Sequence, residues 1–242
     1  MDFGAFSVPC TRADRSVARP KPAFPLTSNA MAEIISARDP MAIDAAVHAL
    51  KAGELIAFPT DTVYGLGAIA TNESAVRRLF SAKNRPPSKA LPLLLADGVM
   101  LGWVAEVTPI ANQLIQVFWP GALTIVMRKL DTYHSIALAK EQTVAVRVPA
   151  HDIARSIVRG VGEPITGTSA NRSGSRSPIS ASEAAFQLGD MVSIVIDDGP
   201  SRGREESTVI DITQPDGAHI LRQGAVTREE LQKVLGSRLA DD

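Results

Sequence analysis

The chain has 242 residues, of which 45% are hydrophobic and 21% are charged, so it can bury a core in one large domain or two small ones. Its net charge of -1 excludes the global basic field that draws proteins to nucleic acid or anionic membranes, so any anion site must be local. The single cysteine excludes an internal disulfide framework, the four histidines lack metal-ligand spacing, and no apolar run approaches the roughly 18 residues of a membrane span. We therefore expect a soluble, cytoplasmic protein.

Residues 1–35 are predicted to form a disordered or loosely attached extension, because Pro, Ser and Arg occur there without a sustained hydrophobic period. Arginines outnumber acids over residues 1–30, as in an organelle transit peptide, but Asp2 and Asp14 disfavour that interpretation. The sequence shows no internal repeat, and no linker after residue 40. Residues 36–242 are therefore predicted to form one domain.

Helix-like and strand-like blocks alternate from about residue 39, which is the pattern of an α/β fold. Helices are expected after typical start signals, including two capping boxes in which Ser or Thr precedes Glu by three residues. These signals lie at Asp39-Pro40, Asn72, Thr108-Pro109, His151, Ser180-x-x-Glu183 and Thr227-x-x-Glu230. Strands are expected within residues 54–59, 91–96, 122–127, 143–149, 163–170, 192–196, 207–212 and 218–222.

Two polar segments follow predicted strands, where open α/β sheets place ligands. In FPTDTVYGLGA, residues 58–68, Thr60 and Thr62 offer hydroxyl groups to a ligand and the glycines permit close backbone approach, although a tight turn explains the same residues. The segment TGTSANRSGSRSP, residues 166–178, is rich in hydroxyl groups and holds Ser169 and Asn171. It suits phosphate or carboxylate oxygens, and the alternative is a flexible Ser/Gly loop.

Cations mark the other candidate sites. In FSAKNRPPSKALPLLLAD, residues 80–97, Lys83 and Arg85 can both reach one anion if Pro86 holds Arg85 extended, and neither is predicted in the core. The alternative is a solvent-facing pair at a helix C-terminus. Arg222, at the end of the last predicted strand, is a candidate phosphate ligand with a surface salt bridge as its alternative.

An acidic pair, Asp197 and Asp198, opens the segment at residues 197–211. Its carboxylates suit either Mg²⁺ or the cap of a turn. Because Gly199-Pro200 follows directly, the sequence favours the turn.

The chain resembles the YrdC-like family, and most closely its L-threonylcarbamoyladenylate synthases. The resemblance covers about residues 41–236 and is carried by FPTDTVYGLGA, AKNRPPSKALPLLL, WPGALTIVM, VAVRVPAHDIA, TSANRSGSRSP, STVIDI and LRQGAVT, in the family's order. It implies a single YrdC-like domain in which a twisted, mixed, open sheet is flanked by helices. It also implies a reaction of L-threonine, bicarbonate or CO₂, and ATP that gives threonylcarbamoyl-AMP and pyrophosphate for the modification of tRNA adenosine.

The resemblance further implies roles for individual residues. It maps the family's active-site tetrad onto Lys83, Arg85, Ser169 and Asn171. It implies that the substrate L-threonine is bound by Thr60, Arg147 and Ser207. It implies that ATP is bound by Lys83, Thr143, Ser169, Ser177 and Arg222. Mg²⁺ is expected to arrive with ATP, and the tRNA threonylcarbamoyl-transfer machinery is the expected downstream partner. Because N-carboxylated threonine is its own nucleophile, no Ser-His or Cys-His pair is required.

Two features depart from the family pattern. Many relatives have PL-x-V-H after the Lys-x-Arg turn, where this chain has ALPLLLAD, and longer members carry a second, C-terminal domain. The chain therefore resembles the short, single-domain type. The alternative function is an RNA-binding YrdC-like module without adenylate synthesis, although near-neutral charge predicts at most a weak, local RNA contact.

Overall fold

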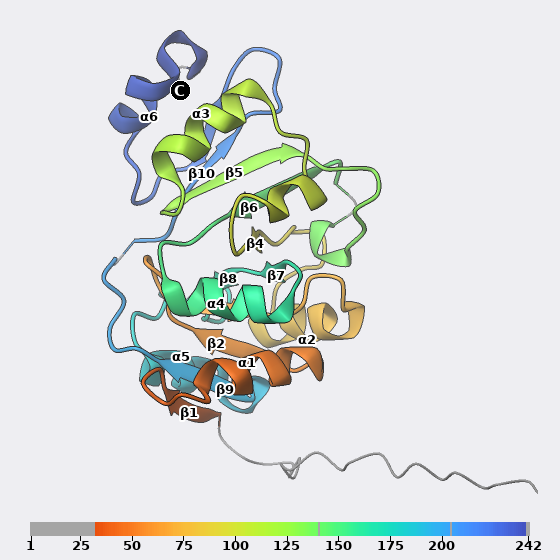
Figure 1. Cartoon of the computed structure of the whole chain (residues 1–242), viewed down its shortest axis with the longest axis vertical. Coiled ribbons are helices and arrows are strands. Elements are labelled where there is room, and N and C mark those ends of the chain that lie inside the picture. Colours follow the sequence, from red (N-terminus) through yellow and green to blue (C-terminus); the bar gives the residue numbers. More distant parts are fainter. Residues whose placement is uncertain (1–31, 140, 204, 241–242) are drawn as a thin grey trace, which may run out of the picture.

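The computed structural model describes residues 32–139, 141–203 and 205–240. In that part of the chain six α-helices and eleven strands alternate, which confirms the predicted α/β class (Figure 1). The helices are α1 (Ala42–Lys51), α2 (Glu73–Lys83), α3 (Pro109–Phe118), α4 (Asp152–Val161), α5 (Ala181–Leu188) and α6 (Arg228–Leu235). The strands are β1 (Glu33–Ser36), β2 (Ile56–Phe58), β3 (Gly65–Gly67), β4 (Leu93–Leu94), β5 (Leu123–Arg128), β6 (Thr143–Arg147), β7 (Ile165–Thr166), β8 (Thr168–Ser169), β9 (Ile194–Asp197), β10 (Thr208–Asp211) and β11 (His219–Arg222).

These strands form two mixed sheets, not the single mixed sheet that was predicted. Five strands pair in the order β1-β9-β2-β3-β8, and six pair in the order β11-β10-β5-β6-β4-β7. In the first sheet β2 is parallel to β9 and antiparallel to β3; in the second β5 is parallel to β10 and antiparallel to β6. Apolar alternation identifies a strand but does not specify its partner, so the division into two sheets was not visible in the sequence.

A junction of one residue joins the two sheets. β7 belongs to the six-stranded sheet and β8 to the five-stranded sheet, and Gly167 alone separates them. A Cβ at Gly167 would lie 2.2 Å from Cγ of Leu94, so the position needs a residue without a side chain. The single strand predicted within residues 163–170 is therefore two short strands in different sheets.

Helices pack on both sheets and complete the layers. α1 and α5 pack on strands of the five-stranded sheet, and α1 also packs against α4 (Figure 1). α3 packs on β5 and against α6. The core between these layers includes fully buried Phe58, Tyr64, Leu93 and Leu123, so the burial of large apolar side chains fixes how the strands lie.

The helix start signals are confirmed except at α1 and, in part, at α5. α1 begins at Ala42, two residues after the predicted Asp39-Pro40 start, and its N-cap residue Met41 makes no side-chain cap hydrogen bond. Asn72 and Thr108 cap α2 and α3 by accepting a backbone N–H three residues on, and Thr227 and Glu230 form a complete capping box at α6. At α5 the capping box is wrong in its second half. The Ser180 hydroxyl accepts from Glu183 N, but the Glu183 carboxylate accepts from Ile179 N, one residue before the cap.

The domain reaches further towards the N-terminus than the predicted boundary at residue 36. β1 begins within the predicted extension, at Glu33, and pairs in parallel with β9 through Glu33 to Ser36. The sequence signal was weak because β1 is a short strand at the sheet edge, with Ile34 half exposed. Residues 1–31 of the predicted extension lie outside the described residues.

Candidate functional site

A cleft of about 570 Å³ lies where the two sheets meet. The five-stranded sheet contributes the β2–β3 loop and β8, and the six-stranded sheet contributes residues of β5, β6, β10 and β11. The structure thus brings most of the predicted site residues together, although they come from distant parts of the chain. Those that line the cleft are Thr60, Lys83, Arg85, Arg147, Ser169, Asn171, Ser207 and Arg222.

Lys83, the last residue of α2, lies under the Ser-x-Asn loop with only 3% of its surface exposed. Its Nζ donates to the carbonyl of Ser169, to the carbonyl of Asn171 at 2.7 Å and to Oδ1 of Asn171 at 3.0 Å. The predicted pairing of these two segments is confirmed. The expectation that Lys83 lies outside the core is wrong, because Lys83 continues the buried stripe of α2 that Val76, Leu79 and Phe80 form at helical spacing.

The chemistry of Lys83 follows from this burial. Burial, and to a smaller extent the positive charge of Arg85, lower its pKa to about 8 against the opposing effect of Glu206. Ser169 Oγ donates to Asn171 Oδ1 at 2.6 Å, and Asn171 Nδ2 donates to the carbonyl of Ser175. The segment after β8 is therefore an ordered network, which excludes the flexible-loop alternative.

Arg85 is fastened to the proline turn that carries it. Its Nε donates to the carbonyl of Lys89 at 3.1 Å and its Nη2 to the carbonyl of Ala90 at 2.8 Å. Burial lowers the pKa of Arg85, as does the nearby charge of Arg222, while Glu206 raises it. The turn therefore holds a partly desolvated guanidinium at the cleft, and the solvent-facing alternative is wrong for this pair.

On the opposite side of the cleft, Arg147 at the end of β6 is held by three partners and is 6% exposed. Its Nε donates to the carbonyl of Gly121 at 2.8 Å, Nη1 to Oγ1 of Thr62 at 3.0 Å and Nη2 to Oδ1 of Asp61 at 2.6 Å. Burial lowers the pKa of Arg147, and the ion pair with Asp61 opposes that shift. Thr62, one of the two threonines singled out in the segment at residues 58–68, lines the cleft as expected. Asp61, which lies between them, was missed as a site residue.

Thr60 occupies a tight turn at the same side of the cleft. Its Oγ1 donates to the carbonyl of Val63 at 2.6 Å and accepts from Thr62 N at 3.2 Å. The turn alternative for this segment is thus correct, and it does not exclude the site, because the turn is what presents Thr62 to Arg147.

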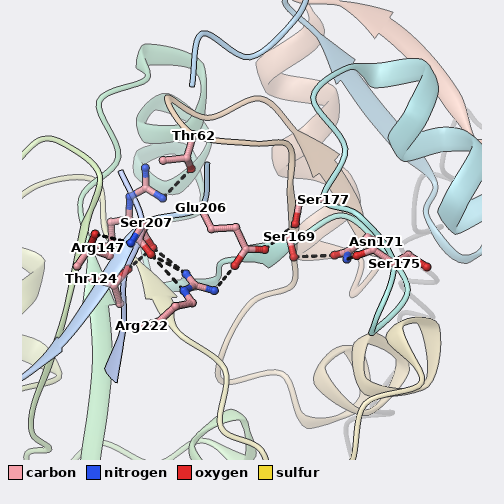
Figure 2. Close-up of polar contacts among 12 residues, drawn as sticks. Thr62, Thr124, Arg147, Ser169, Asn171, Ser175, Ser177, Glu206, Ser207 and Arg222 are labelled. Atoms are coloured by element: carbon pink, nitrogen blue, oxygen red, sulfur yellow. Dashed lines mark hydrogen bonds and ion pairs between the residues drawn. The ribbon is translucent and has the colours of Figure 1, made fainter. Parts of the chain in front are cut away.

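Arg222 joins the end of β11 to the start of β10. Its Nη2 donates to the carbonyl of Ser207 at 2.8 Å, and its Nη1 is paired with Glu206 Oε2 (Figure 2). Ser207 Oγ lies 2.8 Å from Oγ1 of Thr124. Ser177 does not line the cleft, but it reaches the network by donating to Glu206 Oε1 at 2.5 Å. Glu206 was missed by the sequence analysis.

Two further predictions concern residues away from the cleft. Thr143 begins β6 opposite Arg128 and does not line the cleft, although it shares a strand face with Ala145 and Arg147, which do. Asp197 Oδ1 accepts from Gly199 N at 2.9 Å, and Gly199 has a φ of 78°, so the turn interpretation of the acidic pair is confirmed.

Comparison with known proteins identifies the family. A family model for the Sua5, YciO and YrdC proteins, described as telomere recombination, matches residues 48–224. The chain belongs to this family. The YrdC-like resemblance read from the ordered motifs is therefore confirmed.

Relatives in this family carry related names. Threonylcarbamoyl-AMP synthase of Pyrococcus abyssi is 42% identical over 188 residues, which are 77% of this chain and 55% of that protein. Putative threonylcarbamoyl-AMP synthase of Mycobacterium tuberculosis is 39% identical over 213 residues, which are 85% of this chain and 96% of that protein. The chain spans little more than half the length of the relatives from P. abyssi and Bacillus subtilis.

Solved structures give the same result. The crystal structure of P. abyssi Sua5 complexed with L-threonine matches with a TM-score of 0.81 and 39% identity, over 87% of this chain and 63% of that one. E. coli YciO matches with a TM-score of 0.71 and 27% identity, over 80% of this chain and 95% of that one. Within the described part of this chain, no helix is both long and apolar enough to cross a membrane.

Proposed function

We propose that this chain is a threonylcarbamoyl-AMP synthase, which converts L-threonine, bicarbonate or CO₂, and ATP into threonylcarbamoyl-AMP and pyrophosphate. The observation that carries the proposal is the gathering of four cations at one cleft. Arg147 lies on one side and Lys83 and Arg85 on the other, and Arg222 is close enough to both sides for its charge to lower the pKa of Arg85 and of Arg147. The names of the relatives support it, and the threonine complex of P. abyssi Sua5 favours it over an RNA-binding module.

Arg147 is suited to binding the carboxylate of threonine. A guanidinium has five N–H donors, and three of those on Arg147 already have partners among the described residues. Because Asp61, Thr62 and Gly121 fix the guanidinium plane, the remaining donors are oriented before the substrate arrives, and binding costs little further ordering. Thr60 and Ser207 line the same cleft and supply hydroxyl groups.

The opposite side of the cleft is suited to the phosphates of ATP. Ser169 offers a hydroxyl group there, and Lys83 places a positive charge under the Ser-x-Asn loop. Arg222 adds a planar guanidinium at the edge of this side, next to Glu206, to which Ser177 donates from behind the cleft lining. Mg²⁺ would enter as part of the MgATP substrate. Thr143 is a less direct candidate for contact with ATP, since it lies at the far end of β6 from Arg147.

The reaction needs alignment and charge stabilisation from the protein. The neutral amino group of threonine attacks CO₂ and loses a proton to water, which gives a carbamate. A carbamate oxygen then attacks the α-phosphorus of ATP, and the new O–P bond forms as the bond to the β-phosphate breaks and pyrophosphate leaves. Lys83 and Arg85 would offset the repulsion between carbamate and triphosphate, worth about 4 kcal/mol for two unit charges 4 Å apart at an effective dielectric of 20. The tetrad of Lys83, Arg85, Ser169 and Asn171 thus positions and neutralises the reactants.

The product is an activated acyl-adenylate, and we propose that it passes to the tRNA threonylcarbamoyl-transfer machinery in the cytoplasm. Direct contact with RNA would be weak, because the net charge of the chain is -1. A filter-binding titration against salt measures that contact. Tight, steeply salt-dependent binding of duplex RNA without any pyrophosphate release would favour the RNA-binding alternative.

A pyrophosphate-release assay with single-substrate omissions tests the proposed function. Release from ATP should require threonine and bicarbonate together. Arg85→Ala should abolish release, whereas Arg77→Ala, an exposed arginine of α2 paired with Glu73, should leave it unchanged. Equal release without threonine, or full activity in Arg85→Ala, would overturn the assignment.

A further inference from the structure

Glu206 places a carboxylate among the side chains to which ATP has been assigned. Its Oε1 accepts from Ser177 Oγ at 2.5 Å, and its Oε2 is paired with Nη1 of Arg222. Figure 2 shows the carboxylate between Arg222 on one side and Ser177 and Ser169 on the other. No other described residue that lines the cleft carries a carboxylate. Glu206 is therefore the acid that faces the cationic side of the cleft.

The surroundings of Glu206 are those of an anion site. Burial raises the pKa of Glu206, but the hydrogen bond from Ser177, the charge of Arg222 and contributions from Ser169 and Lys83 outweigh burial and hold the pKa below its ordinary value. Hydroxyl and guanidinium groups bind phosphate oxygens in the same way as carboxylate oxygens. A phosphate group and this carboxylate would therefore compete for the same donors, and like charges so close together would repel each other.

The main chain of Glu206 is fixed, while its side chain is only partly enclosed. The Glu206 carbonyl accepts from Ala225 N at 3.0 Å, and a Cβ at Gly224 would lie 2.3 Å from that carbonyl oxygen, so the two segments are in close contact. The Glu206 side chain itself is one-third exposed. Rotation about its side-chain bonds can therefore move the carboxylate away from Ser177 and Arg222 without moving Ser207.

We propose that the Glu206 carboxylate is an internal occupant of a phosphate subsite, held by Ser177 and Arg222 until a phosphate group displaces it. The identification of this phosphate as part of ATP rests on the proposed function. The competition between the carboxylate and a phosphate for the same donors is independent of that function. Glu206 then acts as a specificity-determining residue. A single phosphate must displace it with few new contacts, whereas a polyphosphate also gains contacts at Arg85 and the positive charge of Lys83, and is therefore favoured.

Isothermal titration calorimetry of the full chain tests this competition, with inorganic phosphate and pyrophosphate as probes in metal-free buffer. Glu206→Gln keeps the shape of the side chain and removes its charge. It should bind pyrophosphate about tenfold more tightly than the wild type, and inorganic phosphate should gain at least as much. Glu205→Gln is the matched control, because it changes the net charge equally on an exposed neighbour and should bind as the wild type does.

Each other outcome would overturn the proposal. Unchanged or weaker pyrophosphate binding by Glu206→Gln would show that Glu206 does not compete, and weaker binding only after Mg²⁺ is added would make it a metal ligand instead. If neither anion bound either protein, the subsite itself would be refuted.

A wild-type structure with pyrophosphate gives a readout that does not depend on the folding of a variant. The carboxylate should have left Ser177 and Arg222, and an unmoved carboxylate would refute the proposal. Threonine-dependent pyrophosphate release by the wild type tests the proposed function separately. An active enzyme whose Glu206→Gln variant gains no affinity would refute this inference alone.

Discussion

Because of Lys83, the free energy of unfolding should rise with pH above about pH 8, whereas the affinity for phosphate should fall. Its pKa falls from the ordinary 10.5 to about 8, mainly because of burial. That fall corresponds to roughly 3 kcal/mol of cost for keeping the buried ammonium charged. The hydrogen bonds to Ser169 and Asn171 offset this cost, at about 1.5 to 3 kcal/mol for each bond from a charged donor.

The sign of the stability effect follows from proton binding. Below pH 8 Lys83 is charged in both the folded and the unfolded chain, so it adds no slope. Between pH 8 and 10.5 the unfolded chain holds the proton more tightly, and the free energy of unfolding should rise with pH by about 1.4 kcal/mol per pH unit at most. Phosphate affinity should fall over the same window, because the bound anion needs the charge that is being lost.

Urea unfolding of the wild type and Lys83→Met between pH 7 and 9.5 measures the first effect. The difference in free energy of unfolding between the two proteins should grow by roughly 2 kcal/mol across this range. Lys89→Met, an exposed lysine of the same turn, is the control and should follow the wild type. A constant difference between wild type and Lys83→Met, or pyrophosphate affinity that stays level through pH 8, would refute the reasoning.

Three further substitutions test other parts of the structure. Asp61→Asn should lower the free energy of unfolding by about 3 kcal/mol, because it leaves the buried Arg147 guanidinium without its carboxylate; a loss under about 1 kcal/mol in urea unfolding would contradict the buried ion pair. Thr227→Ala should cost about 1 kcal/mol by removing the cap of α6, and an unchanged urea midpoint would contradict that role. Gly224→Ala should slow threonine-dependent pyrophosphate release by about tenfold or more, because its Cβ would displace the backbone before Ser207. The control Gly98→Ala, at a glycine with open space around it, should keep the wild-type rate. Equal rates for the two variants would contradict the close contact at Gly224.

The sequence predicted the α/β class and most helix starts because these depend on local signals. Asn72, Thr108 and Thr227 cap their helices through hydrogen bonds within three residues, so their type and spacing suffice to identify them. Strand partners depend on contacts between distant segments. The division into two sheets, the two-residue strand β8 and the edge strand β1 therefore became visible only in the structure.

The candidate site shows the same limit at the level of side chains. The pairing of Lys83 with Ser169 and Asn171 was predicted, but its burial was not. Lys83 lies on the buried face of α2, and a lysine is buried there only because acceptors from a distant loop hydrogen-bond its ammonium group. Asp61 lies inside a segment that was chosen for its hydroxyl groups. Its role is to pair with Arg147, which belongs to the other sheet, and the sequence does not show that contact. The sequence offered one signal for Glu206, which is that it directly precedes Ser207, a residue expected to bind the substrate L-threonine.

The junction at Gly167 limits how this protein can vary. Ser169 lies two residues beyond Gly167, and Leu94 of the six-stranded sheet blocks a side chain at the glycine. One inserted residue would turn Ser169 to the opposite face of β8, since successive strand residues point to opposite sides. Loops around the cleft can change in length, but the connection between β7 and β8 is a single residue whose length sets the direction of Ser169. We therefore expect relatives to keep one residue at this connection even where their sequences diverge.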